Sequence, residues 1–154
     1  MPKIEIKAID RLFWLLLLLA SACNESPNDQ YAYYREGLPD SLLPLYNEIL
    51  AVHDEVMPEM TTLSSYQNNI AEEIRLLKSD TSNRDKVRHL NQILGNLNRA
   101  EDAMMTWMHH FSRIDSIPDS EKGMFLENER ISVTGMRDLI FRSLQSSKNY
   151  LDNE

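Results

Sequence analysis

What most constrains the fold of this chain is a run of apolar residues spaced three, four or seven positions apart, from about residue 40 almost to the C-terminus. This spacing places apolar side chains along one face of a long helix. Asp40 or Ser41 is expected to cap the first helix, with Pro44 in its first turn. The stripe of this helix comprises Leu42, Leu45, Ile49, Val52, Val56, Met60, Leu63, Ile70, Ile74 and Leu77.

Two more helices are predicted after the turn-forming sequence at 79–83. Residues 114–118 connect them, and Asp119 or Ser120 is expected to cap the third helix. The stripe of the second helix comprises Val87, Leu90, Leu94, Leu97, Met104, Met108 and Phe111. The stripe of the third comprises Phe125 or Leu126, Val133, Met136, Ile140, Leu144 and Leu151.

The sequence therefore predicts an all-α fold. Only four glycines, no alternating strand pattern and short connections favour an antiparallel up-down-up bundle of three long helices over residues 39–154. Pro58 cannot donate a hydrogen bond to the carbonyl of Asp54, so the first helix is expected to kink there. Gly95 and Gly135 are candidate points of close helix approach.

Residues 1–22 have the features of a secretory signal peptide. They begin with three basic side chains and continue with an apolar core at 12–20. This core is too short for a membrane-spanning helix, which needs about 20 apolar residues. Small residues at 20–22 then match a cleavage site.

Cys23 follows this segment directly and is the only cysteine of the chain. A cysteine in this place is typical of bacterial lipoproteins, where it is acylated and becomes the first mature residue. Secretion without lipid and an uncleaved anchor are the alternatives. Because Asn24 rather than an aspartate follows, we expect export to the outer membrane of the cell envelope. Residues 23–38 would then be a lipidated tether, held on the bilayer by two or three acyl chains.

The charge of the mature chain argues against binding to nucleic acid. Without residues 1–22, about 13 basic and 22 acidic side chains remain, which gives a net charge near −9. Nucleic-acid binding needs clustered Lys and Arg, whereas excess acidic charge keeps a domain soluble. No cysteine remains to form a disulfide, so an apolar core must stabilise the domain alone.

Histidines and methionines are predicted to gather in one layer of the bundle. If the first two helices pair antiparallel about residue 81, Met57 lies level with Met105 and His53 with His109. The candidate metal ligands of this layer are His53, Met57, Met60, Met104, Met105, Met108 and His109.

Thioether sulfur and imidazole both suit Cu(I), which makes this layer a candidate copper site. Met–His ligation of haem is another possibility, without covalent attachment because the chain has no C-x-x-C-H sequence. The simpler interpretation is packing, because methionine fills gaps in cores and Met104 and Met108 already lie on the core stripe. We therefore expect no cofactor, with copper as the alternative.

No pattern in the sequence predicts an enzyme. Successive helical residues point about 100° apart, so His53, Asp54 and Glu55 do not converge on one point. The chain has no nucleophile elbow, Gly-rich phosphate loop, zinc-ligand spacing or Glu-x-x-His pair. His89 and His110 fit no catalytic spacing.

Two stretches, His53–Met60 (HDEVMPEM) and Met104–Phe111 (MMTWMHHF), are recognisable together with the Cys23 segment. With them, most of the mature chain resembles a family of small lipoproteins of Bacteroidetes-type bacteria, often labelled "viral A-type inclusion protein". The resemblance implies long helices and no established activity. His109 and His110 fall at unspecified positions of the family pattern. The residues that match it are His53, Met57, Pro58, Met60, Met104, Met105, Trp107 and Met108.

The sequence thus predicts a non-enzymatic helical lipoprotein, held on the envelope through Cys23, that binds another protein or supports the envelope. Long amphipathic helices offer surfaces for a partner helix. Copper or haem binding is the alternative function. Nucleic acid is not an expected partner, and neither the protein partner nor the oligomeric state follows from the sequence.

Overall fold

The computed structural model of the protein describes residues 36–152. The predicted signal peptide and Cys23 lie outside the described residues. No strand occurs within 36–152, so the all-α prediction is confirmed for this part of the chain. Its α-helices are α3 (Leu43–Val56), α4 (Glu59–Leu77), α5 (Arg84–Phe111) and α6 (Asp119–Leu151), and its 3-10 turns are Asp40–Leu42, Thr81–Asn83 and Ser112–Ser116.

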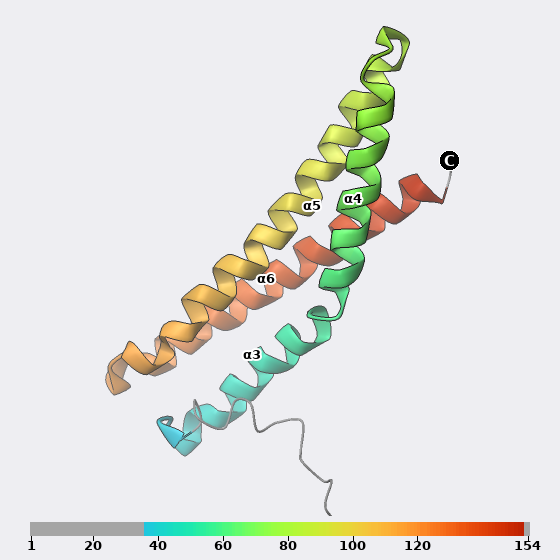
Figure 1. The fold of residues 1–154 in the computed structure, drawn as a ribbon. Helices are drawn as coiled ribbons and strands as arrows, with labels where there is room; N and C mark the ends of the chain where they lie inside the picture. Colours follow the sequence, from blue (N-terminus) through green and yellow to red (C-terminus); the bar gives the residue numbers. More distant parts are fainter. Residues whose placement is uncertain (1–35, 153–154) are drawn as a thin grey trace, which may run out of the picture. The chain divides into compact units, whose positions relative to one another are not determined.

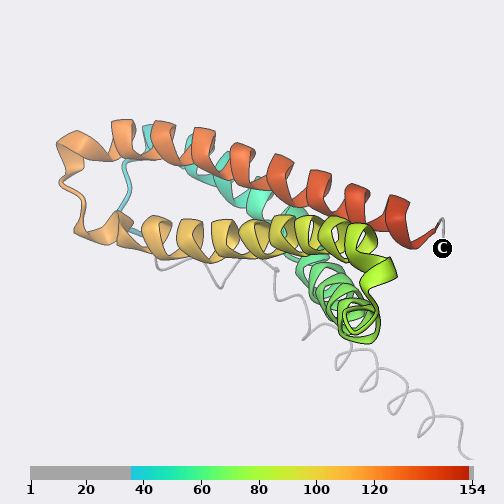
Figure 2. The ribbon, with the colours of Figure 1, turned by 90° about the horizontal axis from the view of Figure 1, so that it is seen from above.

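The helices form the predicted up-down-up bundle (Figure 1). α3 and α4 together make the first arm, α5 runs back along α4, and α6 packs along both α5 and α3. Figure 2 shows α5 and α6 as two long antiparallel neighbours. The two halves of the first arm therefore cover different parts of the α5–α6 pair.

The first arm bends by 38° between α3 and α4, where Pro58 precedes the first residue of α4. The backbone of Met57 still donates to the carbonyl of His53 at 2.9 Å. Pro58 has no N–H to continue this pattern, so the helix breaks and restarts at Glu59. The predicted kink is thus confirmed.

The predicted caps of two helices are wrong. Leu42 is the N-cap of α3 and Pro118 is the N-cap of α6, and neither makes a side-chain cap hydrogen bond. Asp119 is instead the first residue of α6, where its negative charge interacts favourably with the positive end of the helix dipole. The turn at 79–83 is as predicted, since Asp80 accepts a hydrogen bond from the backbone of Ser82 at 2.8 Å.

The buried face of α6 contains polar residues that interrupt its apolar stripe. Lys122, Glu129, Ser143 and Ser147 are all buried there. The full buried set of this helix is Lys122, Leu126, Glu129, Val133, Met136, Ile140, Ser143, Leu144 and Ser147. The predicted apolar positions 126, 133, 136, 140 and 144 are confirmed as core.

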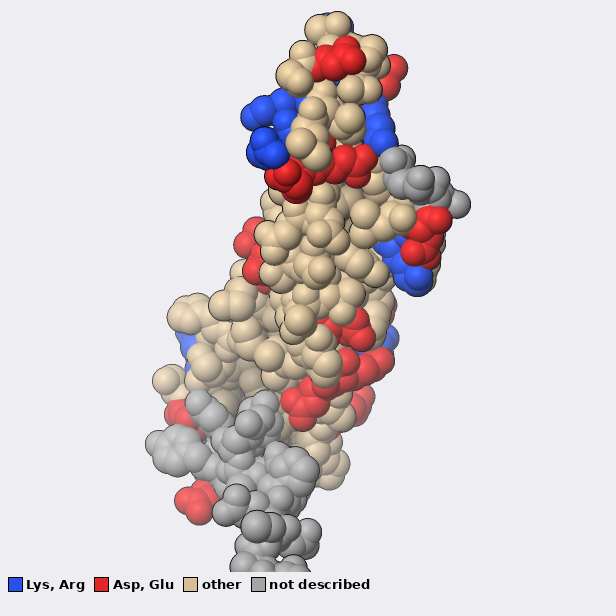
Figure 3. Space-filling view, turned by 45° about the vertical axis from the view of Figure 1, so that its right-hand side comes forward, with Lys and Arg blue, Asp and Glu red and all other residues tan. Residues whose placement is uncertain are grey.

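Gly95 and Gly135 do not mark close helix approach. A Cβ added at either residue would meet no atom within 4 Å. Both glycines therefore face open space, and the expectation of tight packing at them is wrong. On the face drawn in Figure 3, acidic side chains are spread over the surface, and Lys and Arg gather at only a few places.

Candidate functional site

Four aromatic rings form a continuous series between α3 and α5, with two stacked contacts and one tilted contact. The Trp107 ring lies 4.9 Å from that of Phe111 and 5.4 Å from that of His53, measured between centroids. Tyr46 extends the series, 5.5 Å from Phe111. Offset contacts of this kind stabilise a core beyond the area that they bury. These rings join α3 to the C-terminal half of α5.

His53 is the buried histidine of this series. Its Nδ1 lies 2.9 Å from the Oδ1 of Asp54, the next residue along the helix. An ionised carboxylate only accepts hydrogen bonds, so it favours the tautomer of His53 with the proton on Nδ1. The Nε2 atom of His53 then keeps its lone pair.

The predicted metal ligands divide between the interior and the surface. Met57, Met105 and His109 are exposed, whereas Met104 is fully buried. His53 lies beside Trp107, close to the predicted level but not beside His109. The members with buried or half-buried side chains are His53, Met60, Met104 and Met108.

The sequence did not predict a pair between α5 and α6 in which a buried glutamate, Glu129, contacts an exposed histidine, His110. The side chain of Glu129 is 3 % exposed, and its Oε1 lies 2.6 Å from the Nδ1 of His110. The other carboxylate oxygen, Oε2, is buried without a hydrogen-bond partner among residues 36–152. Lys122 and Glu129 lie fourteen and seven residues before Met136, so the helical spacing places both on the buried face of α6. Charged residues are rarely buried, so this spacing did not predict them as core residues.

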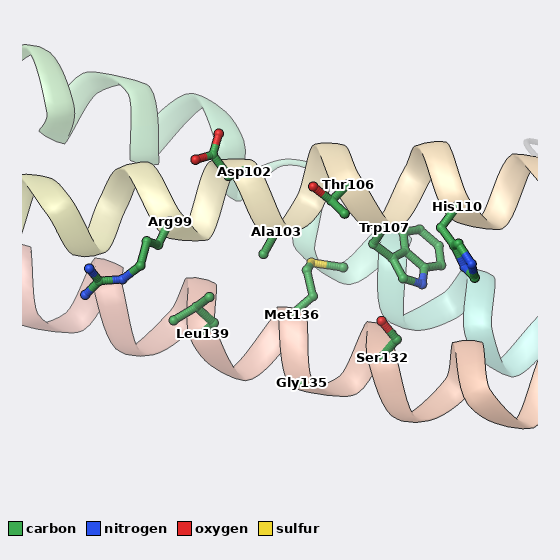
Figure 4. Close-up of a pocket in the computed structure, with 10 residues that line it drawn as sticks. All are labelled: Arg99, Asp102, Ala103, Thr106, Trp107, His110, Ser132, Gly135, Met136 and Leu139. Carbon is green, nitrogen blue, oxygen red and sulfur yellow. The ribbon is translucent and has the colours of Figure 1, made fainter.

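A groove of about 580 Å³ lies between α5 and α6, beside the His110–Glu129 pair (Figure 4). Ala103, Trp107, Met136 and Leu139 give it an apolar floor. The full lining is Arg99, Asp102, Ala103, Thr106, Trp107, His110, Ser132, Gly135, Met136 and Leu139. Its size falls within the range of small-molecule sites, about 300–1,000 Å³.

One polar atom in this groove lacks a partner. Trp107 is 4 % exposed, and its Nε1–H makes no hydrogen bond to any described part of the chain. Figure 4 shows the nitrogen-bearing edge of this ring turned towards α6, in the part of the groove that holds His110 and Ser132. The site thus combines an apolar floor, a free indole donor and an imidazole held by a buried carboxylate.

No known protein helps to assign this site, because no family model, curated protein or solved structure matches the chain. Among the described residues, no three His, Cys, Asp or Glu side chains gather as a metal-binding group. None of the described helices is long and apolar enough to cross a membrane. The functional argument therefore depends on the residues themselves.

Proposed function

We propose that the protein is a non-enzymatic lipoprotein, anchored to the bacterial envelope through an acylated Cys23, whose helical domain binds another protein. The position of Cys23, directly after a short apolar segment and small residues, supports the anchor. Residues 23–38 would form the tether between the lipid and the bundle.

The observation that carries the binding role is a pair of exposed apolar side chains on α6. Met124 is 68 % exposed and Ile131 is 65 % exposed. They are seven residues apart, so they lie on the same face of the helix, away from the buried stripe. Apolar residues in this spacing are the anchors by which helices dock into a partner.

Charge substitution on this face tests the binding role. Native membranes would be cross-linked and the partner recovered with the wild-type chain and with Met124→Glu/Ile131→Glu. We expect the double variant to lose the partner and Leu76→Glu, at a similarly exposed residue of α4, to retain it. Equal recovery by all three chains would contradict a binding face on α6.

The lipid anchor is tested separately by Cys23→Ser. Acyl chains supply about 0.8 kcal/mol of membrane binding for each buried CH₂, so their loss is expected to move the protein to the soluble fraction. Membrane and soluble fractions would be compared by immunoblot. Unchanged membrane association of the variant would refute the anchor without bearing on the α6 face.

A second candidate function is Cu(I) binding around His53. It is favoured by the Asp54 carboxylate on His53 Nδ1, because metal-binding histidines usually donate their other nitrogen to a carboxylate or carbonyl. Met57 follows one turn later on the same helix face, and Met104 and Met108 lie on α5. The haem hypothesis uses the same donors.

Titration with Cu(I) under reducing conditions tests this candidate. Leucine keeps the bulk of methionine without its sulfur, so Met57→Leu/Met104→Leu is expected to lower the affinity for copper. Met136→Leu, at a buried methionine outside the candidate set, should leave it unchanged. An affinity that is the same in all three chains would eliminate the site, and visible spectra after haem addition would test haem.

A further inference from the structure

We propose that the groove between α5 and α6 binds a small apolar molecule that carries one hydroxyl group. The proposal depends neither on the lipid anchor nor on the α6 binding face. It is based on the groove itself, on the free indole donor of Trp107 and on the imidazole of His110.

The floor of the groove selects an apolar body for the ligand. Ala103, Met136, Leu139 and the ring of Trp107 line it. A molecule that covers these side chains removes their apolar surface from water, which is the main driving force for binding in such sites. Space remains above Gly135, where an added Cβ would meet no atom within 4 Å.

Trp107 requires a hydrogen-bond acceptor on the ligand. Its buried Nε1–H has no partner in the described chain, and an indole nitrogen can only donate. Buried donors are nearly always satisfied in folded proteins, so an unsatisfied one points to a missing partner. His110 and Ser132 lie near this edge of the ring, and both are exposed on the groove side.

His110 can accept a hydrogen bond from the same ligand. Glu129 is buried and its Oε1 lies 2.6 Å from His110 Nδ1, so the carboxylate accepts a hydrogen bond from the Nδ1–H group. In the neutral ring, Nε2 is then an acceptor. Glu129 is therefore a positioning residue, which sets the tautomer that the ligand meets.

A hydroxyl group satisfies both requirements. It accepts from Trp107 Nε1–H and donates to His110 Nε2, whereas an ammonium group cannot accept and a carboxylate cannot donate. A charged group would also have to be desolvated beside the apolar floor. The geometry thus selects a neutral alcohol or phenol with an apolar body.

Two matched probes, para-propylphenol and propylbenzene, test this preference. Binding to the full chain with Trp14→Phe would be followed through the indole nitrogen–proton signal of Trp107, then the only tryptophan. Propylbenzene is the more hydrophobic probe, so a plain apolar surface would prefer it. We expect the phenol to bind about tenfold more tightly and to shift the indole signal downfield. Equal or weaker binding of the phenol would overturn the proposal.

Variants at Gly135 locate the binding. Gly135→Leu places a side chain in the groove and is expected to weaken phenol binding at least tenfold. Gly135→Ala adds only a Cβ, which meets nothing within 4 Å, and should bind the phenol as the parent chain does. Both chains retain Trp107, so their indole signals report folding. Undiminished binding by a folded Gly135→Leu chain would place the phenol elsewhere and contradict the assignment.

Discussion

The cores of the two halves of the bundle contain different kinds of side chain. The aliphatic half consists of α4 and the parts of α5 and α6 beside it, and its core contains Leu63, Ile70, Leu90, Ile93, Leu97, Ile140 and Leu144. The aromatic half consists of α3 and the remaining parts of α5 and α6. Beside aliphatic residues such as Ile49, Leu50, Val56, Leu126 and Val133, its core contains Tyr46, His53, Trp107, Phe111, Lys122 and Glu129.

The two cores differ in whether their buried polar atoms have hydrogen-bond partners. In the aliphatic half, the hydroxyl of Ser147 donates to the carbonyl of Ser143 at 2.9 Å, and that of Ser143 to Leu139 at 2.8 Å. In the aromatic half, Trp107 Nε1 and Glu129 Oε2 lack partners within the described chain. Proteins tolerate such costs mainly where function requires them, which agrees with the proposal that the aromatic half binds a ligand.

The largest expected effect is in the aliphatic half. Leu97 is fully buried, so Leu97→Ala should lower the free energy of unfolding by about 2–5 kcal/mol through lost burial and an unfilled cavity. Urea denaturation measures this change. Leu76→Ala, at an exposed position of α4, is the control and should change stability by less than about 0.5 kcal/mol. A small effect of Leu97→Ala would break the comparison.

Glu129→Met is expected to stabilise the protein by about 1–2 kcal/mol. The change removes a buried carboxylate whose second oxygen has no described partner, and it leaves behind only His110, which is exposed to water. Urea denaturation again gives the value. Glu127→Met removes an exposed carboxylate that pairs with Arg130 and should have almost no effect. Destabilisation by Glu129→Met would mean that the pair supports the fold.

Tyr150 makes the stability of the aliphatic half depend on pH in the alkaline range. Burial, together with a 2.6 Å hydrogen bond to Glu73, raises the pKa of Tyr150 to about 12. The unfolded chain loses this proton near pH 10. The contribution to stability is therefore complete below about pH 10 and is lost as the pH rises towards about 12.

Tyr150→Phe tests this contribution. The variant is expected to lose the tyrosine-dependent decrease in the free energy of unfolding between about pH 10 and 12. The ring is only partly buried, so we expect about 1 kcal/mol rather than the roughly 2.7 kcal/mol of a fully buried group with this shift. Denaturation series on both chains give the difference. Identical slopes would show that the hydrogen bond to Glu73 does not contribute.

The smallest expected effect is at Gly135 in the aromatic half. Gly135→Ala should stabilise the domain by about 0.5–1 kcal/mol, because alanine favours the helix and its Cβ meets nothing within 4 Å. A thermal melt detects the change. Gly95→Ala in α5, which also faces open space, provides a second comparison with the same expectation. If Gly135→Ala destabilised the domain and Gly95→Ala did not, the space beside Gly135 would have to stay empty for the helices to pack.

The regular parts of the fold could be predicted from the sequence. The apolar spacing predicted the three long helical arms, Pro58 predicted the bend, and residues 79–83 predicted the first turn. Each of these features follows from local chemistry. The helix caps were predicted wrongly because prolines 39 and 118 lie just before the helical turns in extended backbone and set where they begin.

The candidate site was predicted only in part. The sequence points to the Met104–Phe111 stretch, but not to its partner Glu129 on α6, because a charged residue does not fit an apolar stripe. Exposure was also misjudged, since Met57 and Met105 lie at the surface and Met104 in the core. A helix period places residues on a face, but the neighbouring helices decide whether that face is buried.

Mass spectrometry of the processed protein from its native membrane tests the central claim most directly. The account predicts a mature chain that begins at Cys23, with acyl chains on this residue and with residues 1–22 removed. A free sulfhydryl on Cys23, or a chain that retains residues 1–22, would contradict it.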